Sequence, residues 1–502
     1  MKNFSQHYKT ALILLGGPLF TYFFLNKTMG INAVLFTVWI LGLLTLSRQG
    51  LFKHRSVQLL MTSAIIIAFN CFWHTSINAL IALISNLIVL SGIAYKYKIK
   101  FIISGLLNGL FNLLLFLKNW FHSRKKSSRV NTSSRSLTKL FKLAVAPIAA
   151  IVIFFILFVQ GNLILSSIGN WILNQFNLFL FDFSSYISAS SIFLMITGTC
   201  ITAWVLYSRI PNQIQTFDQK YHINLFRKKQ PRKFKILGLL NEYKSGLILL
   251  ISINVLLALV NGIDIYYVWF NQIPNDWNAS DYSQYVHEGT FSLITSVLLS
   301  MGIMMYYFRG NQNFFNKFSV LRTWALIWIA QNTLLVLSLV IRNWSYVEQF
   351  DLAYKRIGVF LFLLATLVGL FSIAVKIQKK RTFYYLIQTN GWTWLILVFL
   401  MSFVNWDRLI VSYNLEHAGT SAPDMKFILE RSDKTLDIIA KHPQFLTTMP
   451  QYNLGYDHIN DQYLSPKQAY MIRKQAFIDR NRNQHWLSTN IIENRVFKNL
   501  NP

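Results

Sequence analysis

The amino-acid sequence predicts an all-α protein: a polytopic bundle of about eleven transmembrane helices (range roughly ten to thirteen) and a small helical tail outside the membrane. Three observations lead to this fold class. Hydrophobic residues make up 53% of the 502 residues and charged residues only 13%, whereas soluble domains contain about 25% charged residues. The apolar residues form blocks long enough to cross a bilayer, and the loops between these blocks alternate between basic and neutral.

Eleven apolar segments have the composition of membrane spans. They are residues 11–25, 31–46, 56–73, 76–94, 143–160, 187–208, 245–267, 287–308, 320–341, 357–377 and 384–404. The first two are short for a hydrocarbon core about 30 Å thick at about 1.5 Å per residue, so their flanks must contribute. No small-residue cleavage site follows the first segment, which indicates an uncleaved helix rather than a signal peptide.

The net charge of +29 is unevenly distributed along the chain. The tail, residues 405–502, holds 12 Lys/Arg and 10 Asp/Glu, which leaves 36 basic and 9 acidic residues before it. Much of this excess lies in loops between spans, as the positive-inside rule predicts. We therefore expect the lipid bilayer and its anionic headgroups, not nucleic acid, to be the partner of the basic loops.

The basic loops also predict the orientation. Lys and Arg crowd the loops 118–142 and 209–244, whereas the stretches 161–186 and 268–286 contain none. The positive-inside rule places the two basic loops in the cytoplasm, and we expect the chain to lie in the cytoplasmic (inner) membrane. The N-terminus is then cytoplasmic and the tail is outside.

The same pattern predicts how the chain is divided. We expect N-terminal membrane helices in residues 1–117, two spans around an outer amphipathic loop in 143–208, a five-span unit in 245–404 and the outward-facing tail in 405–502.

Residues 101–117 break the alternation. The segment is apolar enough to span, yet basic loops flank it on both sides. We interpret it as re-entrant or as lying in the interface. The alternative is a true crossing, compensated by a further span such as residues 162–181.

The tail changes character after Val404, where charged residues of both signs appear. Ser465-Pro466-Lys467-Gln468 has the pattern of a capping box with proline at the first helical position, which predicts a helix toward Arg480. Ser432 is placed to cap a short helix that ends before Pro443. We expect a helical tail that rests on the outer surface of the bundle.

Familiar catalytic motifs are missing from the sequence. It contains no phosphate-binding loop, no dinucleotide-binding glycine motif, no nucleophile elbow and no zinc-protease helix. Cys71 and Cys200 both fall inside apolar spans, which indicates packing rather than a disulfide or a thiolate metal site. His74, beside Asn70, is the nearest candidate for an acyltransferase histidine, although a lone histidine is more often a structural hydrogen-bonder. We expect no cofactor and no metal.

The informative pattern is a set of charges at the same predicted membrane level. Asp264, Glu288, Arg342, Lys355, Arg356 and Asp407 all lie at the outer ends of consecutive spans. Charges at membrane depth are costly unless they are paired or hydrated, so opposite signs at one level predict a paired outer polar cluster. Two alternatives remain open: each charge ends a helix in water, or the cluster serves helix packing alone.

Four passages resemble a family of polytopic bacterial membrane proteins, common in Bacteroidota, known only as a domain of unknown function. They are Val286 to Phe291, Arg342 to Gly358, Val404 to Asn414 and Asp424 to Pro443, so the resemblance covers about residues 245–443. It implies that Glu288, Arg342, Arg356, Asp407 and Asn414 occupy motif positions of that family. Asp351 and Ala353 depart from it, because they stand where the family usually has glycine and threonine.

Three function classes fit these observations. The first is a non-catalytic envelope component that senses or scaffolds, with envelope partners bound through the tail. The second is a transporter or channel that uses the outer polar cluster. The third is a membrane enzyme that acts on a lipid or a lipid-linked substrate.

Overall fold

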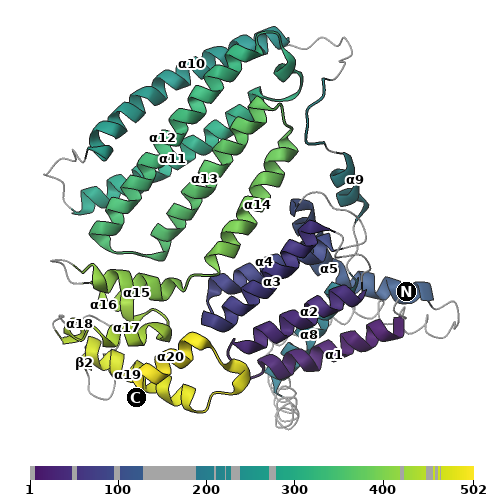
Figure 1. The fold of residues 1–502 in the computed structure, drawn as a ribbon, viewed down its shortest axis with the longest axis vertical. Helices are drawn as coiled ribbons and strands as arrows, with labels where there is room; N and C mark the ends of the chain where they lie inside the picture. Colours follow the sequence, from purple (N-terminus) through teal and green to yellow (C-terminus); the bar gives the residue numbers. More distant parts are fainter. Residues whose placement is uncertain are drawn as a thin grey trace, which may run out of the picture.

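The computed structural model describes residues 6–47, 54–94, 102–127, 188–207, 211–220, 222–227, 238–270, 279–418, 423–447, 456–457, 462–463 and 465–501. The described chain is almost entirely helical and forms two helical bundles and a tail (Figure 1). This arrangement confirms the all-α class and the helical tail. The predicted span 143–160 and its outer loop lie outside the described residues.

The N-terminal bundle contains α1 (Gln6–Phe24), α2 (Ile31–Ser47), α3 (Arg55–His74), α4 (Ile77–Ile93), α5 (Ile102–Ser127) and α8 (Ala189–Tyr207). Its core is a cluster of buried aliphatic and aromatic side chains. The short helix α9 (Asn212–Lys220) follows α8, within the segment predicted as a basic loop.

The C-terminal bundle contains α10 (Leu239–Asp264), the π-helical turn η2 (Ile265–Trp269), α11 (Ala279–Tyr307), the 3-10 turn η3 (Gly310–Phe314), α12 (Phe318–Phe350), α13 (Tyr354–Gln378) and α14 (Phe383–Met401). Its apolar core is separate from that of the N-terminal bundle. Helix α14 also packs against α4 and α5, so it joins the two bundles.

The tail contains α15 (Trp406–Glu416), α16 (Met425–Leu429), η4 (Asp433–Thr435), α17 (Leu436–Ala440), α18 (Gln444–Thr447), α19 (Pro466–Arg482), η5 (Trp486–Ser488) and α20 (Ile491–Leu500). Two short strands, β1 (Tyr456–Asp457) and β2 (Gln462–Tyr463), pair antiparallel, a feature that the sequence did not predict. We call the membrane face under the tail the tail side, and the opposite face the far side.

Ser465 and Ser432 were both predicted to cap helices of the tail. The predicted capping box is present: the Ser465 hydroxyl accepts from the Gln468 N–H, and the Gln468 side chain accepts from the Ser465 N–H. Ser432 is the N-cap residue of η4, which leads into α17, and α17 ends at Ala440, before Pro443 as predicted. The Ser432 hydroxyl makes no capping bond, so the predicted capping is wrong.

The number of spans is not confirmed. Among the described residues, five helical segments are individually long and apolar enough to cross a membrane: Arg55–His74, Ala189–Tyr207, Leu239–Trp269, Phe318–Phe350 and Tyr354–Gln378. Helices α14 and α15, bent by 64°, form a sixth if they are one broken span. Four shorter apolar helices are Ile31–Ser47, Ile77–Ile93, Ile102–Leu115 and Ile294–Tyr307.

Helix α5 bears on the ambiguous segment 101–117. It is one unbroken helix that continues through Ser127, ten residues into the predicted loop 118–142. A Cβ at Gly92 of α4 would lie 1.9 Å from the Gly105 carbonyl oxygen, and one at Gly109 would lie 2.1 Å from that of Ile88. This pairing shows that α4 and α5 run antiparallel with their backbones in close contact, as small residues allow. The segment 101–117 therefore lies in a helix packed along α4, and its apolar part, Ile102–Leu115, is one of the four apolar helices shorter than a full span.

Candidate functional site

A buried ion pair joins α10 to α12 on the tail side of the C-terminal bundle. The Arg342 guanidinium donates to the Asp264 carboxylate, and their side chains are only 7% and 4% exposed. Next to them, the Trp269 indole N–H donates to the Ser338 hydroxyl at 2.9 Å. We call Asp264 and Arg342 the buried pair.

Amide side chains continue from the buried pair toward the middle of the helices. Asn254 donates to the Trp324 carbonyl and Asn261 to the Gln331 carbonyl, both at 3.1 Å. The constant separation of 70 residues shows that α10 and α12 run parallel. Gln331 in turn donates to the Asn254 side chain at 2.8 Å. We call Asn254, Asn261 and Gln331 the amide row.

The buried pair and the amide row retain unpaired acceptors. Among the described atoms, Asp264 Oδ2, Asn261 Oδ1 and Gln331 Oε1 are buried without a hydrogen-bond partner. An unpaired buried polar group costs roughly 1–3 kcal/mol, so these oxygens favour a bound donor such as water. The π-helical turn η2 directly follows Asp264, and such turns are frequent at functional sites.

The connection between α12 and α13 is held by Arg356. Its guanidinium donates to the carbonyls of Phe350 and Asp351 and lies over the Tyr346 ring, 4.4 Å from its centroid. The Asn343 amide donates to the Arg356 carbonyl at 3.0 Å. Arg356 therefore fixes a turn of backbone.

The first tail helix, α15, contacts this connection. Asn414 accepts from the Leu352 N–H at 2.7 Å and donates to the Leu352 carbonyl at 3.1 Å. The Tyr354 hydroxyl donates to the Asp407 carboxylate at 2.9 Å. Asn414 is buried, so it satisfies two main-chain groups that water does not reach.

Asp351 has an unfavourable backbone conformation in the same connection, with φ +68° and ψ +168°. This region is essentially reserved for glycine and costs other residues about 1–3 kcal/mol. Burial raises the pKa of the Asp351 carboxyl, while the Arg356 guanidinium opposes this shift. The glycine that the family resemblance implies at this position is therefore the residue that the backbone requires.

We expect Asp351→Gly to be more stable than Asp351→Ala by about 1–3 kcal/mol. Both variants lose the carboxylate, and only glycine relieves the backbone strain. Thermal unfolding in one detergent measures the difference. Equal melting temperatures for the two variants would show that the backbone is not strained.

Ala353 is the second departure from the family. It is the N-cap residue of α13, with extended φ −140° and ψ 159°, and has no side chain to cap the helix. We expect Ala353→Thr to stabilise the protein by about 0.5–2 kcal/mol, because its hydroxyl can accept a free N–H of the first turn. Ala353→Val is the matched control in the same thermal assay, and an equal gain there would exclude capping as the cause.

The tail is also attached to the N-terminal bundle. The Lys434 ammonium donates to the Thr75 carbonyl and lies 3.6 Å from the Glu493 carboxylate. The Asn490 amide donates to the Thr75 hydroxyl. We call Lys434, Asn490, Glu493 and Thr75 the tail clamp. Burial lowers the pKa of Lys434, and Glu493 opposes that shift.

A second set of bonds joins α3 to the end of α14. The Asn70 amide donates to the Ser402 hydroxyl at 3.0 Å, and His74 Nε2 lies 2.9 Å from the Ser402 carbonyl oxygen. Thus His74, the histidine singled out from the sequence, lies in a contact between the two bundles.

The structure separates the residues of the predicted outer cluster into different contacts. Arg342 pairs with Asp264, Arg356 binds backbone carbonyls, and Asp407 binds a phenol. Among the described side chains, neither Arg356 nor Asp407 forms a salt bridge. Lys355 is exposed, and the side chain of Glu288, on α11, lies outside the described part.

Sequence reasoning missed Asn261 and the residues of the tail clamp. The Asn261 signal was present, because Asn254, Asn261 and Asp264 repeat at seven and three residues along one helix face. Nothing marked Lys434 among the twelve basic residues of the tail. The described residues hold no group of three or more His, Cys, Asp or Glu that could bind a metal.

Residues 56–442 match DUF4153, a domain of unknown function. The chain belongs to this family. The match begins at residue 56, far before the 245 that the motifs indicated, so it includes α4, α5, α8 and all of α3 except its first residue. The DUF4153 region also includes the buried pair, Asn414 and Lys434. Neither a curated protein nor a solved structure matches the chain.

Proposed function

We propose that this DUF4153 protein is a non-catalytic component of a bacterial cell envelope that scaffolds or senses through its tail. In this proposal it lies in the cytoplasmic membrane, with its N-terminus in the cytoplasm and its tail outside. The observation that carries the proposal is that one tail contacts both bundles, through the tail clamp on Thr75 and through Asn414 on Leu352.

Burial of Lys434 makes the tail contact specific. A buried ammonium is costly unless it is paired and hydrogen-bonded, and Thr75 and Glu493 supply both partners. Any partner that moved the tail would break these bonds together with those of Asn414. Such a partner would therefore act on both bundles at once, which suits a sensor or a scaffold.

Cysteine labelling tests the orientation. In a variant without Cys71 and Cys200, we place single cysteines at Asn483 in the tail and at Asn316 on the far side, both exposed. An impermeant thiol reagent should label Asn483→Cys in intact spheroplasts, and Asn316→Cys only after permeabilisation. The reverse pattern contradicts the proposed orientation.

A transport function is the second candidate, and the buried pair with its unpaired acceptors favours it. Purified protein in liposomes distinguishes the two candidates. A proton or cation flux that Asp264→Asn abolishes and Lys434→Met leaves intact would show that the protein is a transporter and not a scaffold.

The scaffold function is tested by measuring how much of a large dye passes the envelope of cells. The cells that are compared contain equal amounts of each variant of this protein in their membranes. Deletion of the gene and Lys434→Met should both raise dye uptake. The exposed Lys441→Met is the matched control and should not. Normal uptake in Lys434→Met cells contradicts the scaffold.

A further inference from the structure

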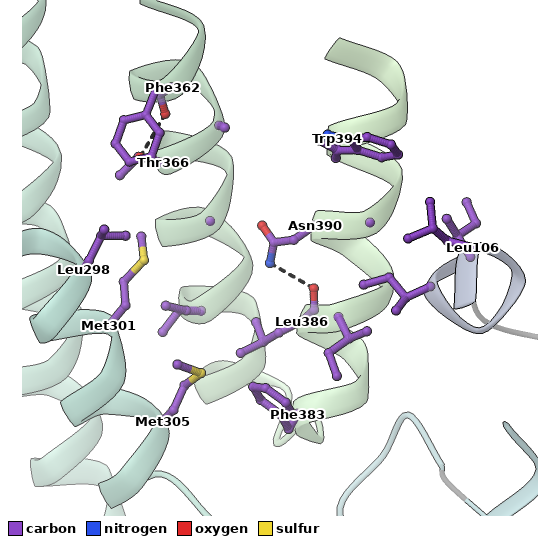
Figure 2. Close-up of a pocket in the computed structure, with 17 residues that line it drawn as sticks. Leu106, Leu298, Met301, Met305, Phe362, Thr366, Phe383, Leu386, Asn390 and Trp394 are labelled. Atoms are coloured by element: carbon purple, nitrogen blue, oxygen red, sulfur yellow. Dashed lines mark hydrogen bonds between the residues drawn. The ribbon is translucent and has the colours of Figure 1, made fainter. Parts of the chain in front are cut away.

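An apolar groove lies between the C-terminal bundle and α5. It has a volume of about 570 Å³ and is lined by residues of α5, α11, α13 and α14 (Figure 2). On α14 the lining runs from Phe383 to Trp394, and Ile103 and Met301 line it from α5 and α11. This volume is within the range of about 300–1,000 Å³ typical of small-molecule sites.

The few polar side chains of the groove are bonded to their own helices. Thr366 donates to the Phe362 carbonyl and Asn390 to the Leu386 carbonyl, both at 2.9 Å (Figure 2). The wall is therefore apolar over most of its area, which suits a hydrocarbon chain rather than a polar solute.

The length of the groove matches one leaflet of a bilayer. Phe383 to Trp394 spans roughly 16 Å at about 1.5 Å per residue, close to half of a hydrocarbon core about 30 Å thick. Phe383 begins α14 on the far side, so the groove extends from the far membrane surface to about the middle of the membrane.

The far-side end of the groove is basic. Lys379, Lys380 and Arg381 are consecutive residues between α13 and α14, and only Thr382 separates them from Phe383. Lys379 is exposed, and the Lys380 ammonium lies 4.9 Å from the centroid of the Phe314 ring. Adjacent basic residues at a membrane surface attract anionic headgroups.

We propose that the groove binds one acyl chain of an anionic phospholipid from the far-side leaflet, with its headgroup on Lys379, Lys380 and Arg381. The apolar wall takes the chain, the leaflet-length groove sets its depth, and the basic connection selects the charge of the headgroup. The site lies on the opposite side of the membrane from the tail clamp and is independent of the proposed scaffold.

Two glycines of α13 provide a matched pair of variants. Gly369 lines the groove, and a Cβ there meets the movable end of Met301 at 3.3 Å and the Asn390 side-chain oxygen at 3.7 Å. A Cβ at Gly358 has nothing within 4 Å. Gly369→Leu therefore fills the groove, whereas Gly358→Leu makes the same change on an open face of the same helix.

Native mass spectrometry of delipidated protein, titrated with palmitoyl-oleoyl phosphatidylglycerol or phosphatidylcholine, tests the proposal. Wild type and Gly358→Leu should prefer phosphatidylglycerol, and Gly369→Leu should bind it about tenfold more weakly or worse. Changing Lys379, Lys380 and Arg381 to Gln together should remove the preference. Equal binding by both glycine variants, or no headgroup preference in wild type, overturns the proposal.

A second measurement covers the case in which Gly369→Leu fails to fold. Phosphatidylglycerol brominated in the acyl chain should quench the fluorescence of wild type more than that of Trp394→Phe, and brominated phosphatidylcholine should show a smaller difference. Equal quenching by the two lipids contradicts the site. If Gly369→Leu instead changes the oligomeric state without any lipid dependence, a protein helix occupies the groove and the proposal is wrong.

Discussion

Replacing Arg342 by glutamine should destabilise the protein in detergent by about 3–5 kcal/mol, because it leaves the Asp264 carboxylate uncompensated among apolar helices. Asp264→Asn should lower the stability by a similar amount. The double variant Asp264→Asn/Arg342→Gln should lose less than the sum of the two, because it retains no isolated charge. Denaturation of the four proteins gives the coupling free energy.

Glu242 and Arg309 provide an exposed control for this cycle. Their side chains are 27% and 58% exposed and their charged atoms lie 3.3 Å apart, so their coupling should be only about 0–1 kcal/mol. A buried pair that couples no more strongly than this exposed pair would falsify our description of α10 and α12.

Asn414→Leu should give the second large effect. It leaves the N–H and the carbonyl of buried Leu352 without partners, at about 1–3 kcal/mol for each group. Asn483→Leu, an exposed position in the same tail, should change stability by about 0.5 kcal/mol or less. If the two variants have the same melting temperature, the tail does not depend on Asn414 for its contact with α12 and α13.

The apolar helices could be predicted from the sequence, because hydrophobic runs of this length rarely form any other structure. Their ends did not, since α12 continues through the polar stretch from Arg342 to Phe350, where hydropathy no longer marks a helix. The same limit applies to α5, which continues past the apolar residues to Ser127.

The sequence predicted the membrane level of the residues in the candidate site, but not which of them pair with each other. Counting spans placed Asp264 and Arg342 at the same membrane level, but their pairing depends on the rotation of α10 against α12, which hydropathy does not specify. Asp351 and Ala353 illustrate the opposite case: the resemblance marked both as departures, and the backbone angles show why glycine and threonine suit these positions.

The tail clamp could not be read from the sequence for a different reason. Lys434 is buried only because η4 and α20 place it against the end of α3. A lysine in a charged tail is normally exposed, so its burial is a tertiary effect that local composition does not signal.

The contact between the tail and the N-terminal bundle is the central claim, and a cysteine pair tests it directly. Thr75→Cys/Asn490→Cys, in a background without Cys71 and Cys200, replaces two side chains that touch in the structure. Under mild oxidation in native membranes, peptide mass spectrometry should find the two peptides disulfide-linked, and neither single variant should form the link. If the pair stays unlinked while both thiols react after unfolding, the tail does not lie on α3, and the scaffold built on that contact is wrong.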